Sequence, residues 1–75
     1  MPYIAIKGYP KDEETVKKAV EEIKEVMLRV WGCPQQVLSI SYEAVPPEEW
    51  QERVRRQEIE AKPENMMILD GEKKY

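Results

Sequence analysis

The sequence predicts an α/β fold: one βαβ unit with parallel strands, then a second short helix and a C-terminal tail. The prediction comes from strand-like alternation in residues 3–8, a long amphipathic pattern in residues 13–31, and alternation again in residues 37–42. Two strands separated by a helix pair in parallel through a right-handed crossover connection. The chain has 75 residues, so we expect a single domain that spans residues 1–75.

The first strand is predicted over residues 3–8, where Ile4 and Ile6 alternate with neighbours that point to the other face. Gly8 and Pro10 then interrupt the pattern. One face of this strand is therefore expected to turn toward a core.

The central helix is the element with the strongest pattern. Asp12 is a good N-cap, and Gly32 followed by Pro34 ends the helix with a left-handed cap. Between them, apolar residues recur at helical spacing: Val16, Ala19, Val20, Ile23, Val26, Met27 and Val30. This stripe predicts a helix that packs one side against the strands.

The second strand is predicted over residues 37–42. Its alternation places apolar side chains on one face and serines on the other, namely Leu38, Ile40 and Tyr42 against Ser39 and Ser41. Pro47 opens a second, short helix that carries Trp50 and Val54. Beyond it, residues 66–69 could add a short strand, and residues 71–75 are interpreted as a tail.

The composition excludes several classes of function. The chain contains no histidine and one cysteine, Cys33, so a Ser-His-Asp triad, an internal disulfide and a structural zinc site are not expected. With a net charge of -3 and mixed signs along the chain, we expect no nucleic-acid or membrane partner and a cytoplasmic location. No cofactor is expected.

A chain this short buries only about 60% of the surface that its unfolded form exposes. Two strands and one helix cannot cover their own apolar surface. We therefore expect the βαβ unit to be completed by packing against a second copy of the chain.

Four segments together resemble the 4-oxalocrotonate tautomerase family. They are residues 1–4, Met-Pro-Tyr-Ile, which open a strand; the capped helix that ends in Gly32-Cys33-Pro34; the strand 37–43; and Pro47-Glu48-Glu49-Trp50. Residues 59–64 and the terminal tyrosine resemble the longer, phenylpyruvate tautomerase-like branch. The resemblance spans nearly the whole chain and implies a tautomerase/MIF-like fold.

In this family the amino-terminal proline is the general base, a role that the resemblance assigns to Pro2. Once Met1 is removed, Pro2 becomes a secondary amine, and burial in a partly apolar pocket would lower its pKa toward neutrality. With Met1 attached, its nitrogen belongs to a tertiary amide and has no basic lone pair. Trp50 matches an aromatic residue that walls the pocket, although ordinary packing also explains a tryptophan there.

The resemblance assigns substrate binding to Lys11 and Ser39. Lys11 falls at or beside an arginine that binds the substrate carboxylate in the best-known members, and Ser39 stands where another arginine is expected. Lysine lacks the planar fork that grips a carboxylate with two hydrogen bonds. A monocarboxylate with an apolar or aromatic tail, such as phenylenolpyruvate, therefore fits better than a dicarboxylate.

The implied function is that of a cofactor-independent keto-enol tautomerase, an isomerase that acts on a small 2-hydroxydienoate or enolpyruvate-type acid. The family assembles as dimers, expected here, or as hexamers built from dimers. A second hypothesis within the enzymes is a hydratase or dehalogenase, with Glu43 as the candidate residue that activates water. The alternative from another class is a weak or inactive oligomeric binding module of the same fold.

Overall fold

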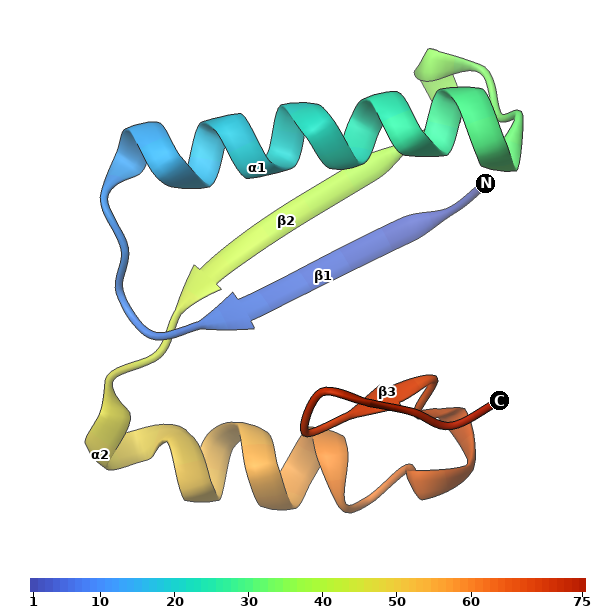
Figure 1. Ribbon diagram of the computed structural model, residues 1–75. Helices are drawn as coiled ribbons and strands as arrows, with labels where there is room; N and C mark the ends of the chain where they lie inside the picture. The colour runs from blue at the N-terminus through green and yellow to red at the C-terminus, as the bar shows by residue number, and fades with distance from the viewer. The chain divides into compact units, whose positions relative to one another are not determined.

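The computed structural model describes residues 1–75 and contains two compact units, Met1–Val45 and Pro46–Tyr75 (Figure 1). The expectation of a single domain over residues 1–75 stays a prediction. No helix combines the length and the apolar character needed to cross a bilayer.

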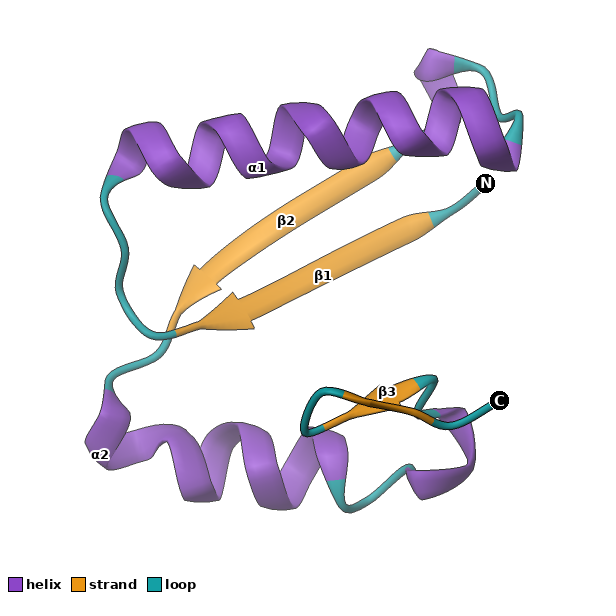
Figure 2. Ribbon diagram, viewed as in Figure 1, coloured by secondary structure: helices purple, strands orange, loops and turns teal.

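The first unit is the predicted βαβ unit. It consists of β1 (Tyr3–Gly8), α1 (Glu13–Val26) and β2 (Ser39–Ala44). β1 and β2 pair in parallel, in a register that runs from Tyr3 opposite Ser39 to Gly8 opposite Ala44. α1 lies over one face of this two-stranded sheet (Figure 2). The predicted fold class is confirmed.

The predicted alternation of the strands is also confirmed. Ile4 and Ile6 of β1 are half-buried, and so are Ile40 and Tyr42 of β2. The residues of opposite parity are exposed: Tyr3, Ala5, Ser39 and Ser41. Because side chains alternate along a strand, the first set faces α1 and the second set lies on the other face.

Asp12 is the N-cap of α1, as predicted. Its carboxylate accepts hydrogen bonds from the Thr15 backbone N–H at 2.9 Å and from the Thr15 hydroxyl at 2.8 Å. These bonds lower the pKa of Asp12 from its ordinary 3.8, with the backbone N–H as the largest cause. The cap therefore binds the charged form of the carboxylate.

The helix continues past α1 in a wider, π-helical form, η1 (Met27–Trp31). The Gly32 N–H donates to the Met27 carbonyl at 3.0 Å, a bond that spans five residues. Gly32 has φ +82, so the predicted left-handed cap is confirmed. The π-helical turn itself was not predicted, because it leaves no signature in an apolar stripe.

β2 begins two residues later than predicted and extends two residues further. A 3₁₀ turn, η2 (Gln35–Val37), occupies the start of the predicted strand, where the Val37 N–H donates to the Pro34 carbonyl at 3.2 Å. At the other end, the N–H of Val45, a fully buried residue, donates to the Gly8 carbonyl at 2.8 Å. The pairing with β1 therefore continues to the end of the first unit.

The second unit begins with the predicted short helix, α2 (Pro47–Trp50). It continues as a π-helical segment, η3 (Gln51–Ile59), in which Val54 is the buried residue at 4% exposure. Glu60 closes this segment with an N–H bond of 2.8 Å to the Arg55 carbonyl. A 3₁₀ turn follows, η4 (Pro63–Asn65).

The interpretation of residues 71–75 as a tail was wrong. β3 (Ile68–Leu69) pairs antiparallel with β4 (Glu72–Lys73). Asp70 and Gly71 join them with φ angles of +50 and +80, the combination that a two-residue hairpin turn requires. The Asp-Gly pair was the available signal, and the two-residue strands were too short to show alternation.

Replacing Asp12 with alanine should lower the melting temperature and shift the unfolding midpoint, because two N-terminal donors lose their acceptor. The folded-state pKa of Asp12 is depressed, so its contribution is present above about pH 3.8 and is lost as pH falls through the lower folded value. Thermal melts at pH 7 and pH 2 measure this. Asp12→Asn, which keeps an acceptor, should lose less, and equal melts for all three proteins would contradict the cap.

Replacing Arg55 with glutamine should loosen the β3–β4 hairpin. The Arg55 guanidinium holds both carboxylate oxygens of Asp70, at 2.9 and 3.1 Å. Amide exchange of the Lys74 N–H, which donates within the hairpin, should become faster in the variant. Arg56→Gln is the matched control, because Arg56 pairs with Glu52 on the helix at 3.0 Å. Unchanged exchange in the Arg55 variant would show that the pair does not hold the turn.

Candidate active site

Pro2 lies directly before β1 and is half-buried. Its carbonyl accepts a hydrogen bond from the Ser39 backbone N–H at 3.3 Å, so the strand pairing brings these two predicted site residues together. The Ser39 side chain is exposed, on the face of the sheet away from α1. Met1 precedes Pro2 and is 99% exposed.

A polar pair that the sequence reasoning missed lies beside Ser39. The Tyr3 and Ser41 hydroxyl oxygens are 2.9 Å apart, and either can donate. Tyr3 pairs with Ser39 in the register, and Ser41 is two residues further along β2, so all three side chains share one face. Strand parity was the signal that could have grouped them.

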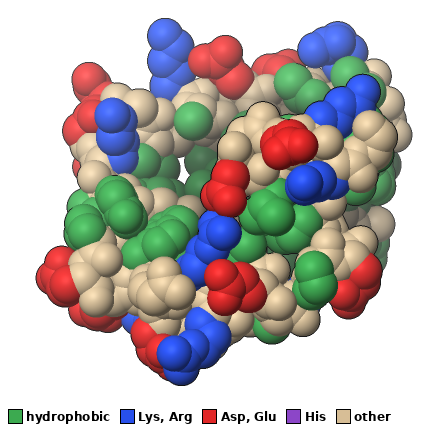
Figure 3. Space-filling model, turned by 60° about the horizontal axis from the view of Figure 1, so that its bottom comes forward, with side chains coloured by type: hydrophobic (Ala, Val, Ile, Leu, Met, Phe, Trp, Pro, Cys, Tyr) green, Lys and Arg blue, Asp and Glu red, His purple; other side chains and the backbone are tan.

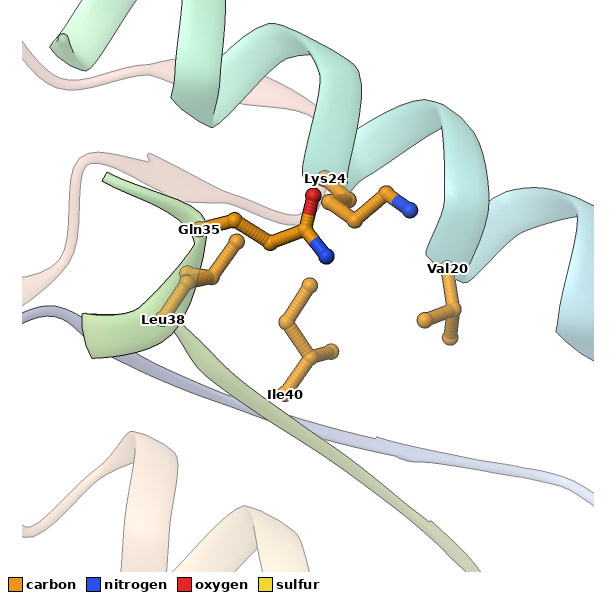
Figure 4. Close-up of a pocket in the computed structure, with 5 residues that line it drawn as sticks. All are labelled: Val20, Lys24, Gln35, Leu38 and Ile40. Carbon is orange, nitrogen blue, oxygen red and sulfur yellow. The ribbon is translucent and has the colours of Figure 1, made fainter. Parts of the chain in front are cut away.

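On the other side of the sheet, a cavity of about 320 Å³ lies between α1 and the start of β2 (Figure 4). The cavity is lined by Val20 and Lys24 from α1, by Gln35 from η2, and by Leu38 and Ile40, which flank the first residue of β2. Figure 4 shows the Gln35 amide and the Lys24 side chain projecting into the space between helix and strand. This volume is in the range of small-molecule sites, about 300–1,000 Å³.

The charge of this cavity comes from Lys24. Its ammonium lies 2.9 Å from the Glu21 carboxylate, and this hydrogen bond and charge raise the pKa of Lys24. An ammonium and an amide together can donate hydrogen bonds to a carboxylate or a carbonyl oxygen. Leu38 and Ile40 flank Ser39, so the cavity is at the same end of the sheet as Pro2.

Lys11 is at the other end. It is exposed in the loop that follows β1, where it lines a separate cavity. Between Tyr3 and Gly8 the strand extends roughly 17 Å, at about 3.3 Å per residue. Within one chain, the structure therefore does not bring Lys11 to Pro2 and Ser39.

Two other candidate site residues, Trp50 and Glu43, lie on other elements. Trp50 is half-buried at the end of α2, in the second unit. Glu43 is in β2 opposite Lys7, whose ammonium lies 3.8 Å from its carboxylate. Because Glu43 is four residues along β2 from Ser39, it is not beside Pro2 in the same chain.

No group of three or more acidic or cysteine side chains is arranged to hold a metal ion. Cys33 is free and half-buried, with its sulfur 3.9 Å from the Met27 carbonyl. The side-chain groups near the Pro2 end of the first unit are therefore hydroxyls, the Lys24 ammonium and the Gln35 amide.

Large apolar side chains also reach the surface, between acidic and basic ones, as Figure 3 shows for one face. At the end of the first long helix, Val30 is 68% and Trp31 is 69% exposed. Tyr3, on the face of the sheet away from α1, is 66% exposed.

The fold is that of a small α/β protein with a parallel βαβ unit and a proline at its first strand, which is consistent with a tautomerase. No family model matches the sequence. Over 56 residues the chain is 30% identical to Tautomerase PptA of Pectobacterium atrosepticum, a region that covers 72% of this chain and 74% of PptA. The chain therefore belongs to the tautomerase family, which makes it an isomerase at the level of the family.

Proposed function

We propose that this protein is a cofactor-independent keto-enol tautomerase of the 4-oxalocrotonate tautomerase type, in the phenylpyruvate tautomerase-like branch, with Pro2 as its general base. The observation that carries the proposal is the position of Pro2. It is half-buried at the start of β1 and held beside Ser39 by a backbone hydrogen bond of 3.3 Å. Similarity to a protein named as a tautomerase supports the same activity.

The chemistry requires removal of Met1, which leaves Pro2 with a secondary amine. The amine takes the proton of the enol hydroxyl and leaves an enolate, which becomes the ketone once its carbon is protonated. The same nitrogen then returns its proton to carbon, so base and acid are one group and nothing is consumed. A cofactor has no step in this sequence.

The proposed substrate is a small 2-hydroxydienoate or enolpyruvate-type acid with one carboxylate and an apolar or aromatic tail. Lys24 and Gln35 supply donors for a carboxylate or carbonyl oxygen at the Pro2 end of the first unit. Neither residue is an arginine, so a second carboxylate would lack the two hydrogen bonds that a planar guanidinium donates. The role of pocket wall that the resemblance assigns to Trp50 stays a prediction.

We further propose a homodimer in which each site takes residues from both chains, with a hexamer of three dimers as the alternative. The two-stranded sheet leaves the outer edges of β1 and β2 without a partner strand in the chain. Val30 and Trp31 are about two-thirds exposed, and a second copy of the chain would cover this apolar area. Since Lys11 is at the opposite end of β1 from Pro2, a second copy is also the way for Lys11 to reach a Pro2 site.

Replacing Pro2 with alanine should lower kcat/KM for phenylenolpyruvate ketonisation by roughly 100-fold, the contribution of a positioned base. The rate is followed by loss of enol absorbance, with protein whose intact mass confirms removal of Met1. Lys18→Ala is the control, because Lys18 is exposed on α1 and lies outside the candidate site. If Pro2→Ala and wild type match the uncatalysed rate, the binding-module function replaces this proposal.

Mixing the variants Pro2→Ala and Lys11→Ala should give a higher activity than either variant has alone. Lys11→Ala alone is expected to lose about tenfold in kcat/KM, the size of a charged hydrogen bond. In a mixed dimer with shared sites, one site carries both changes and the other carries none, so an equal mixture recovers about a quarter of wild-type activity.

The mixture is prepared by unfolding and refolding the two variants together, and a mixture of wild type with Pro2→Ala calibrates the recovery. Activity equal to the mean of the separate variants would show that Pro2 and Lys11 do not share a site across chains. Light scattering on the same samples distinguishes a dimer from a hexamer.

A further inference from the structure

The cavity between α1 and the start of β2 lies on the same face of the sheet as Pro2. Pro2 has the strand parity of Ile4, whose side chain faces α1. The register that sets Tyr3 opposite Ser39, taken one residue back, places Pro2 opposite Leu38, and Leu38 lines the cavity. Paired strands are about 4.7–4.9 Å apart, so the wall of the cavity begins one strand spacing from the Pro2 backbone.

The polar side chains of the lining, Lys24 and Gln35, both donate hydrogen bonds. Figure 4 shows the Gln35 amide directed at the space between Lys24 and Ile40. An ammonium has three N–H groups, and Lys24 gives one of them to the Glu21 carboxylate at 2.9 Å. Two N–H groups of Lys24 and those of the Gln35 amide are therefore left for an oxygen atom of a ligand.

Glu21 determines which kind of oxygen these donors favour. Its carboxylate balances the charge of Lys24, so this pair adds no net positive charge that would attract an anion. A substrate carboxylate bound at Lys24 would also lie near the Glu21 carboxylate, and like charges repel. A hydroxyl or carbonyl oxygen is neutral in the bound substrate, so it reaches the same donors without this repulsion.

We propose that Lys24 and Gln35 bind the enol oxygen of the substrate and stabilise the enolate that forms when Pro2 takes its proton, while Glu21 disfavours a carboxylate at this position. The inference rests on the proposed function and orients the substrate within it. The enol oxygen lies at Lys24 and Gln35, and the carboxylate is left to Lys11 of a second copy.

The proton balance of the reaction is unchanged by these donors. The enol proton passes to the Pro2 nitrogen, which then protonates carbon, and Lys24 donates hydrogen bonds without losing a proton. The hydrogen bond and charge of Glu21 raise the pKa of Lys24, so its ammonium stays protonated. Negative charge appears on the oxygen as Pro2 becomes a cation, so the donors bind the enolate more strongly than the neutral enol.

Lys24→Met should lower kcat for phenylenolpyruvate ketonisation by roughly tenfold and leave KM nearly unchanged, because the lost interaction strengthens only as the enolate forms. This is less than the loss of about 10²–10³-fold for a donor in an enclosed oxyanion site, since the Lys24 side chain is 30% exposed. Lys24→Arg, which keeps a cationic donor, should recover part of the rate. Gln35→Ala should also lower kcat.

The matched controls are Lys18→Met on α1 and Gln36→Ala on the same 3₁₀ turn as Gln35, and both should keep the wild-type rate. A raised KM with unchanged kcat in Lys24→Met would place the substrate carboxylate at Lys24 and overturn the proposal. Unchanged kinetics in both Lys24→Met and Gln35→Ala would overturn it as well.

Acetophenone and benzoate test the preferred oxygen without catalysis, because they are similar in size and present a ketone and a carboxylate. Each is titrated into uniformly labelled protein and followed by NMR. Acetophenone should shift the methyl signals of Leu38 and Ile40, with a dissociation constant on the order of a millimolar. Benzoate should bind there roughly fivefold more weakly, the size of one exposed charge interaction.

Glu21→Gln should remove the difference between the two ligands, because it leaves the Lys24 charge unbalanced. Glu22→Gln makes the same change of charge at the next exposed position and should preserve the difference. The absence of acetophenone shifts at Leu38 and Ile40, or benzoate binding there as tightly as acetophenone in wild type, would overturn the assignment.

The failure of this inference differs from the failure of the proposed function. If Pro2→Ala loses activity while Lys24→Met and Gln35→Ala keep it, the enolate assignment is wrong and the tautomerase stands. If wild type is inactive while acetophenone binds with the expected preference over benzoate, the proposed function is wrong and the oxygen site at Lys24 and Gln35 stands.

Discussion

The parallel pairing of β1 with β2 is the constraint on which the rest of the first unit depends. Parallel strands need a long connection, and α1 supplies it while covering the face that Ile4, Ile6 and Ile40 share. The register sets the neighbours of every candidate residue. Pro2 is beside Ser39 because Tyr3 is opposite Ser39, and one step of slip would exchange the two faces of β2.

The sequence was sufficient to predict elements whose signals are local. The Asp12 cap and the glycine at position 32 bracket the helix, and alternation identified both strands, because each depends on spacing within a few residues. The change to π-helical turns depends on hydrogen-bond partners five residues apart, which composition does not encode. The β3–β4 hairpin was missed because its two strands are too short to show alternation, although Asp70-Gly71 marked its turn.

The site was predictable in part for the same reason. Pro2 and Ser39 come together through strand register, which the two alternating segments nearly determine. The cavity at Lys24 and Gln35 could not be predicted, because it forms where a 3₁₀ turn replaces the expected start of β2 beneath α1. Lys11 shows the limit of carrying a role over from a family, since within one chain it lines a different cavity.

The hydrogen bond that fixes the start of β1 uses the carbonyl of Pro2, while the nitrogen of Pro2 has no hydrogen to give to the sheet. Under the proposed function, removal of Met1 would therefore create an amine directly before β1 without removing a hydrogen bond of the ladder. Such a maturation step would change the reactivity of the chain and leave its strand pairing unaltered. For a tautomerase of the proposed kind, folding and activation would thus be separate events on one scaffold.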